Sequence, residues 1–326
     1  MSDILSPPQC LENSLVHKML IDFPDFSLAN QWQIKTIEEF APIEVKRISK
    51  LGLVNCYALH VSWEDHLLKD CKTFVDAETR IAKIDEYLKK QSNISKVIWT
   101  VHNLTSHSSI LKDAETLLRS VIMEYASTIN LMSMKHAFMI PETHRKKINI
   151  VPHYIDHDKN FNNLEKQKQP TYFKFGADRG RKDNDVYIKV LNNPDIRKFV
   201  SDKRLKLEID DGETVITNRR FTFYEAEFYA QLANFSTFYQ KSTFNSGVLN
   251  FMIGKKIAVF HDEDSVRFMD LPQSYNEFCL ELEAINEFKP SDWLSNISIN
   301  DEDVDDFIRA RNPINVSKIF WEGVFS

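Results

Sequence analysis

Short apolar runs rich in β-branched and aromatic residues alternate in this sequence with amphipathic helical stretches. This alternation is typical of parallel βα units, in which a helix follows each strand and returns the chain to the same end of the sheet. The first group of predicted strands is Met19–Phe23, Tyr57–Val61, Lys96–His102, Thr128–Met132 and Asn149–His153. The second group is Tyr172–Gly176, Lys206–Ile209, Thr237–Gln240 and Lys256–Phe260. We therefore expect an α/β protein with two sheets.

A polar segment separates the two groups of strands and is the best candidate for a linker. It covers residues 156–170 and reads DHDKNFNNLEKQKQP, which is rich in Asn, Lys and Gln and ends in proline. The 326 residues are enough for two domains. We expect a first domain over residues 1–160, a second over 161–312 and a final helix within 313–326. Two further predicted helices are Asp76–Gln91, with Asp76 as its cap, and Glu302–Arg311.

The overall charge and the cysteine pattern exclude several classes of protein. The net charge is −6, so we expect no nucleic-acid binding through a cationic surface. The four cysteines lack CxxC spacing, which argues against a zinc knuckle or a disulfide framework and fits a reducing cytoplasm. No apolar run approaches the roughly 20 residues that a membrane span needs. Any membrane contact is therefore expected to be peripheral.

Polar residues that follow the predicted strands are the first functional candidates, because open parallel sheets bind ligands at the carboxyl ends of their strands. His102, Asn103 and His107 come after Lys96–Thr100, and His153 ends another predicted strand. Such side chains can donate or accept hydrogen bonds without a fixed charge. The alternative interpretations are a helix-capping loop after His102 and a structural histidine at position 153.

Glycine is scarce in this chain, with 7 among 326 residues, and two of the seven lie in one basic loop. The loop comes after Tyr172–Phe175 and contains Gly176 and Gly180 together with Arg179 and Lys182. Glycine lets backbone N–H groups approach a ligand closely, and Arg and Lys suit phosphate oxygens. The loop is therefore a candidate anion site, with a solvated basic turn as the alternative.

A second candidate anion site follows the strand Thr237–Gln240. Asn245 or Ser246 is expected to cap a helix that begins near Gly247 and ends near Gly254. The first turn of a helix presents unpaired N–H groups, which bind anions. Both candidate anion sites belong to the second group of strands, so we expect this half of the chain to hold a diphosphate.

Five blocks of the sequence also carry a family resemblance. They are YALHVSWEDHLL, KVIWTVHNLTSH, INIVPHYID, FKFGADRGRKDND and STFNSGVLNFMIGKKIAVF. In this order they resemble bacterial glycosyltransferases of the GT-B fold, in the group-1, GT4-like branch that builds capsules, O-antigens and exopolysaccharides. The resemblance covers the chain from about Met19 onward. It implies two Rossmann-like domains facing across a cleft, an acceptor-binding one and then a nucleotide-sugar-binding one, with the last helix crossing back to the first domain.

The resemblance implies a metal-independent hexosyltransferase that needs no cofactor besides its donor, a UDP- or GDP-linked sugar. The acceptor would be a saccharide or a lipid-linked saccharide, and the protein would act in the cytoplasm or at the cytoplasmic face of the membrane. The residues matched to catalysis are His102, Arg179 and Lys182. Those matched to donor or phosphate binding are Gly176, Asn245, Ser246, Gly247 and His153. Asn103, His107 and Glu64 are expected to position the acceptor or the sugar.

The role of His102 depends on the stereochemical outcome. In an inverting enzyme His102 would be the general base, with Glu64 or Asp65 behind it. In a retaining enzyme it would only position the sugar. Many retaining relatives carry two glutamates spaced eight apart near the last block, whereas this chain has no Asp or Glu from Phe228 to His261.

Two other functions remain open from the sequence. The missing acidic residues leave open an inactive GT-B subunit that binds a partner or an acceptor. Asp262, Glu263 and Asp264 follow a predicted strand and resemble the DxD metal site of GT-A transferases. Two basic stretches, 144–147 and 197–206, are candidates for contact with anionic headgroups, with a solvated face as the alternative.

Overall fold

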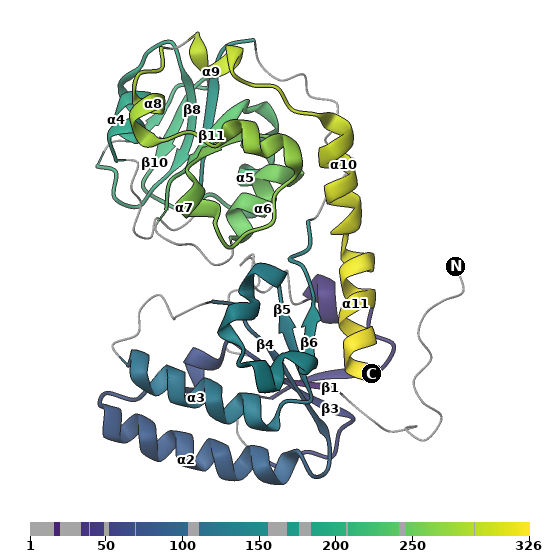
Figure 1. Cartoon of the computed structure of the whole chain (residues 1–326). Coiled ribbons are helices and arrows are strands. Elements are labelled where there is room, and N and C mark those ends of the chain that lie inside the picture. Colours follow the sequence, from purple (N-terminus) through teal and green to yellow (C-terminus); the bar gives the residue numbers. More distant parts are fainter. Residues whose placement is uncertain are drawn as a thin grey trace. The chain divides into compact units, whose positions relative to one another are not determined.

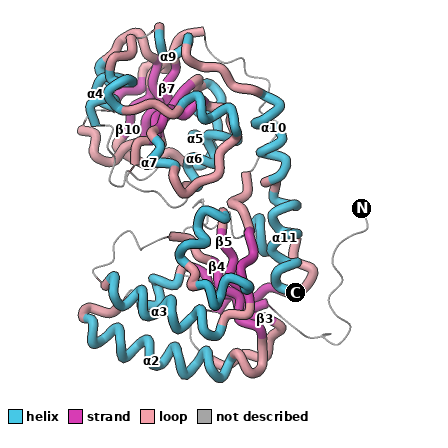
Figure 2. Tube along the Cα trace, in the orientation of Figure 1, coloured by secondary structure: helices cyan, strands magenta, loops and turns pink. Residues whose placement is uncertain are grey.

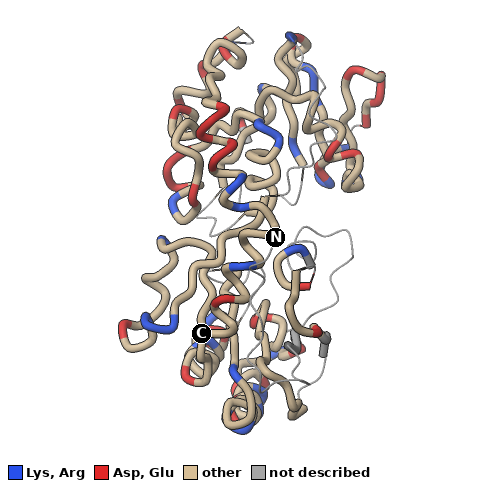
Figure 3. The backbone as a smooth tube through the Cα atoms, turned by 90° about the vertical axis from the view of Figure 1, so that its right-hand side faces the viewer, with Lys and Arg blue, Asp and Glu red and all other residues tan. Residues whose placement is uncertain are grey.

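The computed structural model describes residues 16–19, 34–38, 40–48, 52–68, 70–103, 111–155, 168–175, 184–206, 208–240, 246–289 and 291–326. The chain forms two compact units (Figure 1). Unit 1 consists of Met1–Tyr154 together with Pro313–Ser326, and unit 2 is Ile155–Asn312. Basic and acidic residues both occur along the backbone of each unit (Figure 3).

Unit 1 is built on a six-stranded sheet in the order β2-β1-β3-β4-β5-β6, and the strand pairs are parallel. The strands are β1 (Val16–Met19), β2 (Val45–Ile48), β3 (Ala58–Ser62), β4 (Lys96–Thr100), β5 (Thr128–Leu131) and β6 (Ile148–Ile150). The strand order reverses between β1 and β3, as in a doubly wound sheet. The strand predicted at Met19–Phe23 instead occupies Val16–Met19, and β2 was not predicted.

Helices cover the sheet of unit 1 (Figure 2). They are η1 (Ile34–Glu38), η2 (Glu64–Leu68), α2 (Phe74–Gln91), α3 (Lys112–Tyr125), η3 (Met134–Met139), η4 (Glu142–Lys147) and α11 (Pro313–Phe325). Helix α2 is the one predicted from the periodicity, and its apolar face is buried. Its cap is Thr73 rather than Asp76. The Thr73 hydroxyl accepts from the Asp76 N–H, and the Asp76 carboxylate accepts from the Thr73 N–H, which makes a capping box.

The final helix, α11, packs against η1, β5 and β6 of unit 1. The expectation that the last helix returns to the first domain is confirmed. Gly323 makes this close approach possible, because a Cβ atom there would lie 2.2 Å from Asn149 Nδ2. That amide donates to Asn130 Oδ1 at 3.1 Å and to the Ile319 carbonyl at 3.3 Å. The Asn149 side chain thus links β5 to α11 by hydrogen bonds.

Unit 2 is built on a second six-stranded sheet, in the order β12-β11-β7-β8-β10-β9. The strands are β7 (Thr171–Lys174), β8 (Arg197–Ser201), β9 (Ile209–Asp210), β10 (Val215–Thr217), β11 (Phe235–Phe238) and β12 (Ala258–His261). All neighbouring pairs are parallel except β9 with β10, which is antiparallel. The predicted α/β fold class is therefore confirmed in both units.

The basic stretch 197–206 is not exposed along its whole length, as both of its sequence interpretations assumed. Its first half is the strand β8 in the middle of the sheet, where Lys198 is buried and donates to the carbonyls of Asn193 and Ile196. Burial of this ammonium lowers the pKa of Lys198. The first half of the stretch is thus a packed strand, whereas Lys203, Arg204 and Lys206 after it are exposed.

The helices of unit 2 enclose an aromatic core. They are α4 (Asn184–Asn192), α5 (Phe223–Leu232), α6 (Gly247–Gly254), α7 (Glu263–Val266), η6 (Gln273–Phe278), α8 (Leu282–Asn286), α9 (Asp292–Ser295) and α10 (Asp301–Ala310). The Trp293 ring stacks on Phe235, with 4.5 Å between ring centroids, and meets Phe260 edge-on. None of the described helices is both long and apolar enough to cross a membrane.

Candidate functional site

The sheet topology identifies one edge of each unit as the place for a ligand. In an open parallel sheet, ligands bind outside the carboxyl ends of the strands, where the strand order reverses. The reversal lies between β1 and β3 in unit 1 and between β7 and β11 in unit 2. The residues to examine are therefore those that follow β7, β11 and β3, together with those after β4, the neighbour of β3; the residues that follow β1 lie outside the described part of the chain.

His102 lies at this edge of unit 1, directly beyond β4, and only 4% of it is exposed. The register of the sheet aligns Ser62, the last residue of β3, with Thr100 on β4. Two residues further along, His102 Nε2 hydrogen-bonds to Ser62 Oγ at 2.9 Å. The imidazole is therefore held in one orientation by a side chain of the neighbouring strand.

Trp63 covers one face of the His102 ring. The two rings are stacked, with 4.3 Å between their centroids and 9° between their planes. Trp63 has a φ of 57°, in the left-handed region that a bulky residue rarely adopts. Backbone strain of this kind costs of order 1–3 kcal/mol and gathers at functional sites, where the surrounding structure imposes it. The strained backbone directs the indole onto His102.

Glu64 stabilises the same edge of the sheet through buried hydrogen bonds. Its carboxylate accepts hydrogen bonds from Arg119 Nε at 2.8 Å and from Trp99 Nε1 at 3.4 Å. Arg119 Nη2 also donates to the Asn103 carbonyl at 2.8 Å. Burial raises the pKa of Glu64, although the Arg119 charge opposes the shift. Through Arg119, Glu64 fixes the backbone that follows His102.

His153 also lies beyond a strand end of unit 1, after β6. Its Nδ1–H donates to the Tyr154 carbonyl at 2.8 Å, and its ring stacks on the Tyr154 ring at a centroid distance of 5.6 Å. Burial lowers the pKa of His153 to about 4. The side chain is therefore neutral at pH 7 and offers hydrogen bonds rather than charge.

In unit 2, Ser246 begins α6 as one of the two caps that the sequence predicted. Its hydroxyl oxygen accepts from the Leu249 N–H at 3.1 Å, and Gly247 is the first residue of the helix. The Ser246 proton remains able to donate to a ligand. Gly176, Arg179, Lys182, Asn245 and His107 lie outside the described residues.

Lys174 is a cation that the sequence analysis overlooked. It is the last residue of β7, at the point where the strand order reverses, and it is half-buried. Its Nζ lies 3.5 Å from the Thr237 carbonyl of β11 and 5.8 Å from the centroid of the Tyr187 ring. A lysine within the apolar run YFKF is the pattern that points to it.

The other overlooked residues of the site are Ser62, Trp63 and Arg119. An aromatic residue after a predicted strand is visible in the sequence, but the left-handed backbone of Trp63 is not. Arg119 pairs with a carboxylate 55 positions away, which no local pattern reveals.

The acidic triplet after β12 has a structural role. The Asp262 carboxylate caps α7 by accepting from the Ser265 N–H at 2.8 Å. Within the described part of the chain, no group of three His, Cys, Asp or Glu side chains could hold a metal ion.

Comparison with known proteins shows the fold. No protein-family model and no curated protein sequence matches this chain. Among solved structures, that of trehalose-6-phosphate from E. coli bound with UDP-2-fluoro glucose has a TM-score of 0.57 at 6% identity and covers 96% of this chain and 99% of its own. An α,α-trehalose-phosphate synthase (UDP-forming) from Burkholderia vietnamiensis has a TM-score of 0.55 at 5% identity, with coverages of 95% and 97%. The chain therefore has the GT-B fold, and the GT-A alternative is excluded.

Proposed function

We propose that this chain is a glycosyltransferase that moves a sugar from a nucleotide-diphosphate sugar to a saccharide or lipid-linked acceptor in surface polysaccharide synthesis. The observation that carries the proposal is the seating of His102 beyond β4, fixed by Ser62 Oγ and covered by the Trp63 ring. Such a fixed imidazole can hydrogen-bond a sugar hydroxyl with little cost in side-chain entropy. The fold, shared with structures whose names include UDP or a UDP-sugar, supports the donor class.

In this proposal unit 2 binds the diphosphate of the donor. Arg179 and Lys182 would stabilise the negative charge that develops on the departing nucleotide, assisted by the first N–H groups of α6 beside Ser246 and Gly247. The Ser246 hydroxyl would donate to a phosphate oxygen. Fixed cations and N–H dipoles can provide this stabilisation without a metal, so we expect turnover to survive excess EDTA.

In unit 1, His102 would contact the sugar or the attacking acceptor hydroxyl. If the enzyme inverts, His102 takes the proton of that hydroxyl; if it retains, His102 only positions the sugar. Glu64 and Arg119 act as positioning residues because they hold the backbone at Asn103. The acceptor, when lipid-linked, would bring the protein to the cytoplasmic face of the membrane as a peripheral protein.

The test begins with a screen of nucleotide-sugars for thermal stabilisation and for release of the nucleotide diphosphate. With the best donor, we expect His102→Ala to lower kcat at least 100-fold while the affinity for the nucleotide diphosphate stays within two-fold. The double variant Arg179→Ala/Lys182→Ala should lose nucleotide affinity instead. His144→Ala, which changes a histidine of η4, is the matched control. Unchanged turnover in a folded His102→Ala protein would refute the proposed role of His102.

A second candidate is an inactive GT-B subunit that binds a partner transferase or an acceptor. The stretch without Asp or Glu from Phe228 to His261 favours it, because a carboxylate in that region binds the ribose in many retaining relatives. Calorimetric titration with UDP, GDP and CDP separates the two candidates. Binding of any of them supports the transferase, whereas binding of none supports the subunit.

A further inference from the structure

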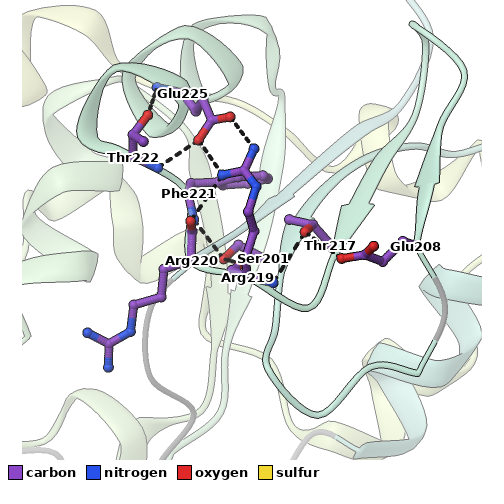
Figure 4. A network of polar contacts seen from close by, with 8 residues as sticks. All are labelled: Ser201, Glu208, Thr217, Arg219, Arg220, Phe221, Thr222 and Glu225. Atoms are coloured by element: carbon purple, nitrogen blue, oxygen red, sulfur yellow. Dashed lines mark hydrogen bonds and ion pairs between the residues drawn. The ribbon is translucent and has the colours of Figure 1, made fainter.

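Two adjacent arginines, Arg219 and Arg220, follow β10 at the carboxyl ends of the strands of unit 2. The side chain of Arg219 forms an ion pair, and that of Arg220 forms none with the described residues. They lie in the short loop 218–222, between Thr217 and α5 (Figure 4). Arg219 is paired with Glu225, with one of its nitrogens 2.7 Å from Glu225 Oε2 and a second close to Oε1. Arg220 is exposed, and in the part of the chain that the structure describes its guanidinium has no partner.

The loop that carries Arg220 is braced on both sides. Ser201 Oγ donates to the Arg219 carbonyl at 2.7 Å and accepts from the Phe221 N–H at 3.1 Å. On the other side, the Thr222 hydroxyl accepts from the Glu225 N–H and the Glu225 carboxylate accepts from the Thr222 N–H, which closes a capping box. The backbone on both sides of Arg220 is thus fixed before any ligand arrives.

Three acidic side chains near this loop accept hydrogen bonds from neighbouring side chains. Glu208, which is exposed and precedes β9, accepts from the Thr217 hydroxyl at 3.3 Å (Figure 4). Glu225 is held by Arg219, and this pairing lowers the pKa of Glu225 to about 2. Asp202, after β8, accepts from Arg204 at 2.8 Å and from the Tyr187 hydroxyl at 3.0 Å. In Figure 4 the Arg220 side chain points away from the Arg219–Glu225 pair. The Arg220 guanidinium is therefore exposed, and no described residue accepts a hydrogen bond from it.

The position of β10 limits what Arg220 can reach. One strand, β8, separates β10 from β7, so the loop lies about 10 Å along the edge from the reversal of strand order. A diphosphate at the reversal, as the proposed function requires, would extend its nucleoside by a comparable length. The opposite flank, after β12, carries Asp262, Glu263 and Asp264, which would repel a nucleotide. The basic flank near Arg220 is thus the favourable direction for the nucleoside.

We infer that Arg220 recognises the base of the nucleotide by donating hydrogen bonds to a carbonyl oxygen of the ring. Arginine has only donors, so it suits uracil, cytosine and guanine, whose ring carbonyl oxygens accept hydrogen bonds, whereas adenine offers only ring nitrogens as acceptors. Guanine is the best match, because O6 and N7 accept both arms of a guanidinium. This inference rests on the proposed function, in which unit 2 binds a nucleotide diphosphate.

Calorimetric titration of the full chain with UDP, GDP, ADP and inorganic diphosphate tests the inference. In Arg220→Gln, we expect the affinities for UDP and GDP to fall about ten-fold, while those for ADP and inorganic diphosphate stay within two-fold of the unchanged protein. Arg80→Gln, which removes one exposed cation from α2 in unit 1, should alter none of the four. A thermal melt of each variant confirms that it is folded.

Each other outcome has a definite meaning. An equal loss of affinity for inorganic diphosphate would place Arg220 on the phosphates, and an unchanged affinity for UDP and GDP would remove it from the nucleotide site. Either result overturns the inference and leaves the proposed function intact. If the unchanged protein binds none of the nucleotides, the proposed function falls, and the inference falls with it.

Discussion

The two units have similar sheet topologies, but the ion pairs at the carboxyl ends of their strands differ in how far they are buried. At the edge formed by the carboxyl ends of the strands of unit 1, the Arg119–Glu64 pair is buried, with exposed side-chain fractions of 12% and 4%, and it holds the backbone that follows His102. At the corresponding edge of unit 2, the Arg219–Glu225 pair is more exposed, at 55% and 29%, and the next arginine has no partner among the described residues. In the proposed function, the first edge orients uncharged hydroxyls and the second binds an anionic ligand.

The carboxylates at the two edges also differ in the direction of their pKa shifts. Burial raises the pKa of Glu64 in unit 1, even though Arg119 opposes the shift. In unit 2, the hydrogen bonds from Arg219 lower the pKa of Glu225 to about 2. Burial alone would raise the pKa of Asp202, but the hydrogen bonds from Arg204 and Tyr187 outweigh it and lower this pKa to about 2. The hydrogen bonds from neighbouring side chains therefore outweigh burial for Glu225 and Asp202, whereas burial outweighs the Arg119 charge for Glu64.

The largest effect is expected from breaking the buried pair of unit 1. Arg119→Met leaves the Glu64 carboxylate buried without its cation and removes the donor to the Asn103 carbonyl. Loss of one partner of a buried pair costs about 3–5 kcal/mol. Urea unfolding should show this loss. Arg219→Met, at the exposed pair of unit 2, should cost less than about 1 kcal/mol.

The double variant Glu64→Gln/Arg119→Met is the decisive control for that prediction. Because it removes both charges, it should recover part of the stability that Arg119→Met alone loses. Lys90→Met breaks an exposed pair on α2 and should change little. Equal costs for Arg119→Met and Arg219→Met would remove the distinction between the two edges.

A smaller loss of unfolding free energy is expected from disturbing the packing of α11 against the rest of unit 1. Gly323→Ala would place a Cβ atom 2.2 Å from Asn149 Nδ2, whose hydrogen bonds to Asn130 and to α11 would have to break or lengthen. Overpacking of this kind costs about 1–3 kcal/mol. Thermal unfolding of the full chain measures it.

Gly254→Ala, at the end of α6 in unit 2, is a matched change of helical glycine. Asn149→Ala combined with Gly323→Ala separates the clash from the change of backbone entropy. The double variant should be no less stable than Asn149→Ala alone if the clash is the cause. A Gly323→Ala protein as stable as the unchanged chain would show that Asn149 yields without cost.

Local patterns in the sequence predicted what is local in the structure. The strands β3 to β6 and the helix α2 follow from periodicity, and Ser246 follows from the preference of helix starts for a hydroxyl. The strands β8 and β10 were missed, because β8 opens with Arg197 and Lys198 and β10 has only three residues. Tertiary packing decides such segments.

The candidate site also contains residues that chain order predicts and contacts that only the tertiary structure reveals. His102 was predicted because it follows a strand, which is a property of chain order. Its contact with Ser62 and its cover by Trp63 arise from the pairing of β3 with β4, and the Glu64–Arg119 pair joins residues far apart in the chain. Arg220 was not singled out, since one arginine of an adjacent pair looks like the other until Glu225 is seen to bind Arg219.

The smallest effect concerns the sign of the pH dependence at the two edges. The folded pKa of Glu225 is about 2, below its ordinary 4.5, so its ionised form stabilises the fold above pH 4.5, and this stability is lost as the pH falls toward 2. Because the pair is partly exposed, the contribution is under about 1 kcal/mol. The folded pKa of Glu64 lies above 4.5, so its contribution declines as the pH rises from 4.5 through that pKa. Unfolding free energies from pH 3 to pH 8 should therefore show a shallower acid slope in Glu225→Gln and a changed slope only above pH 4.5 in Glu64→Gln. If both variants altered the same pH window, the two carboxylates would share one environment and the contrast between the edges would not hold.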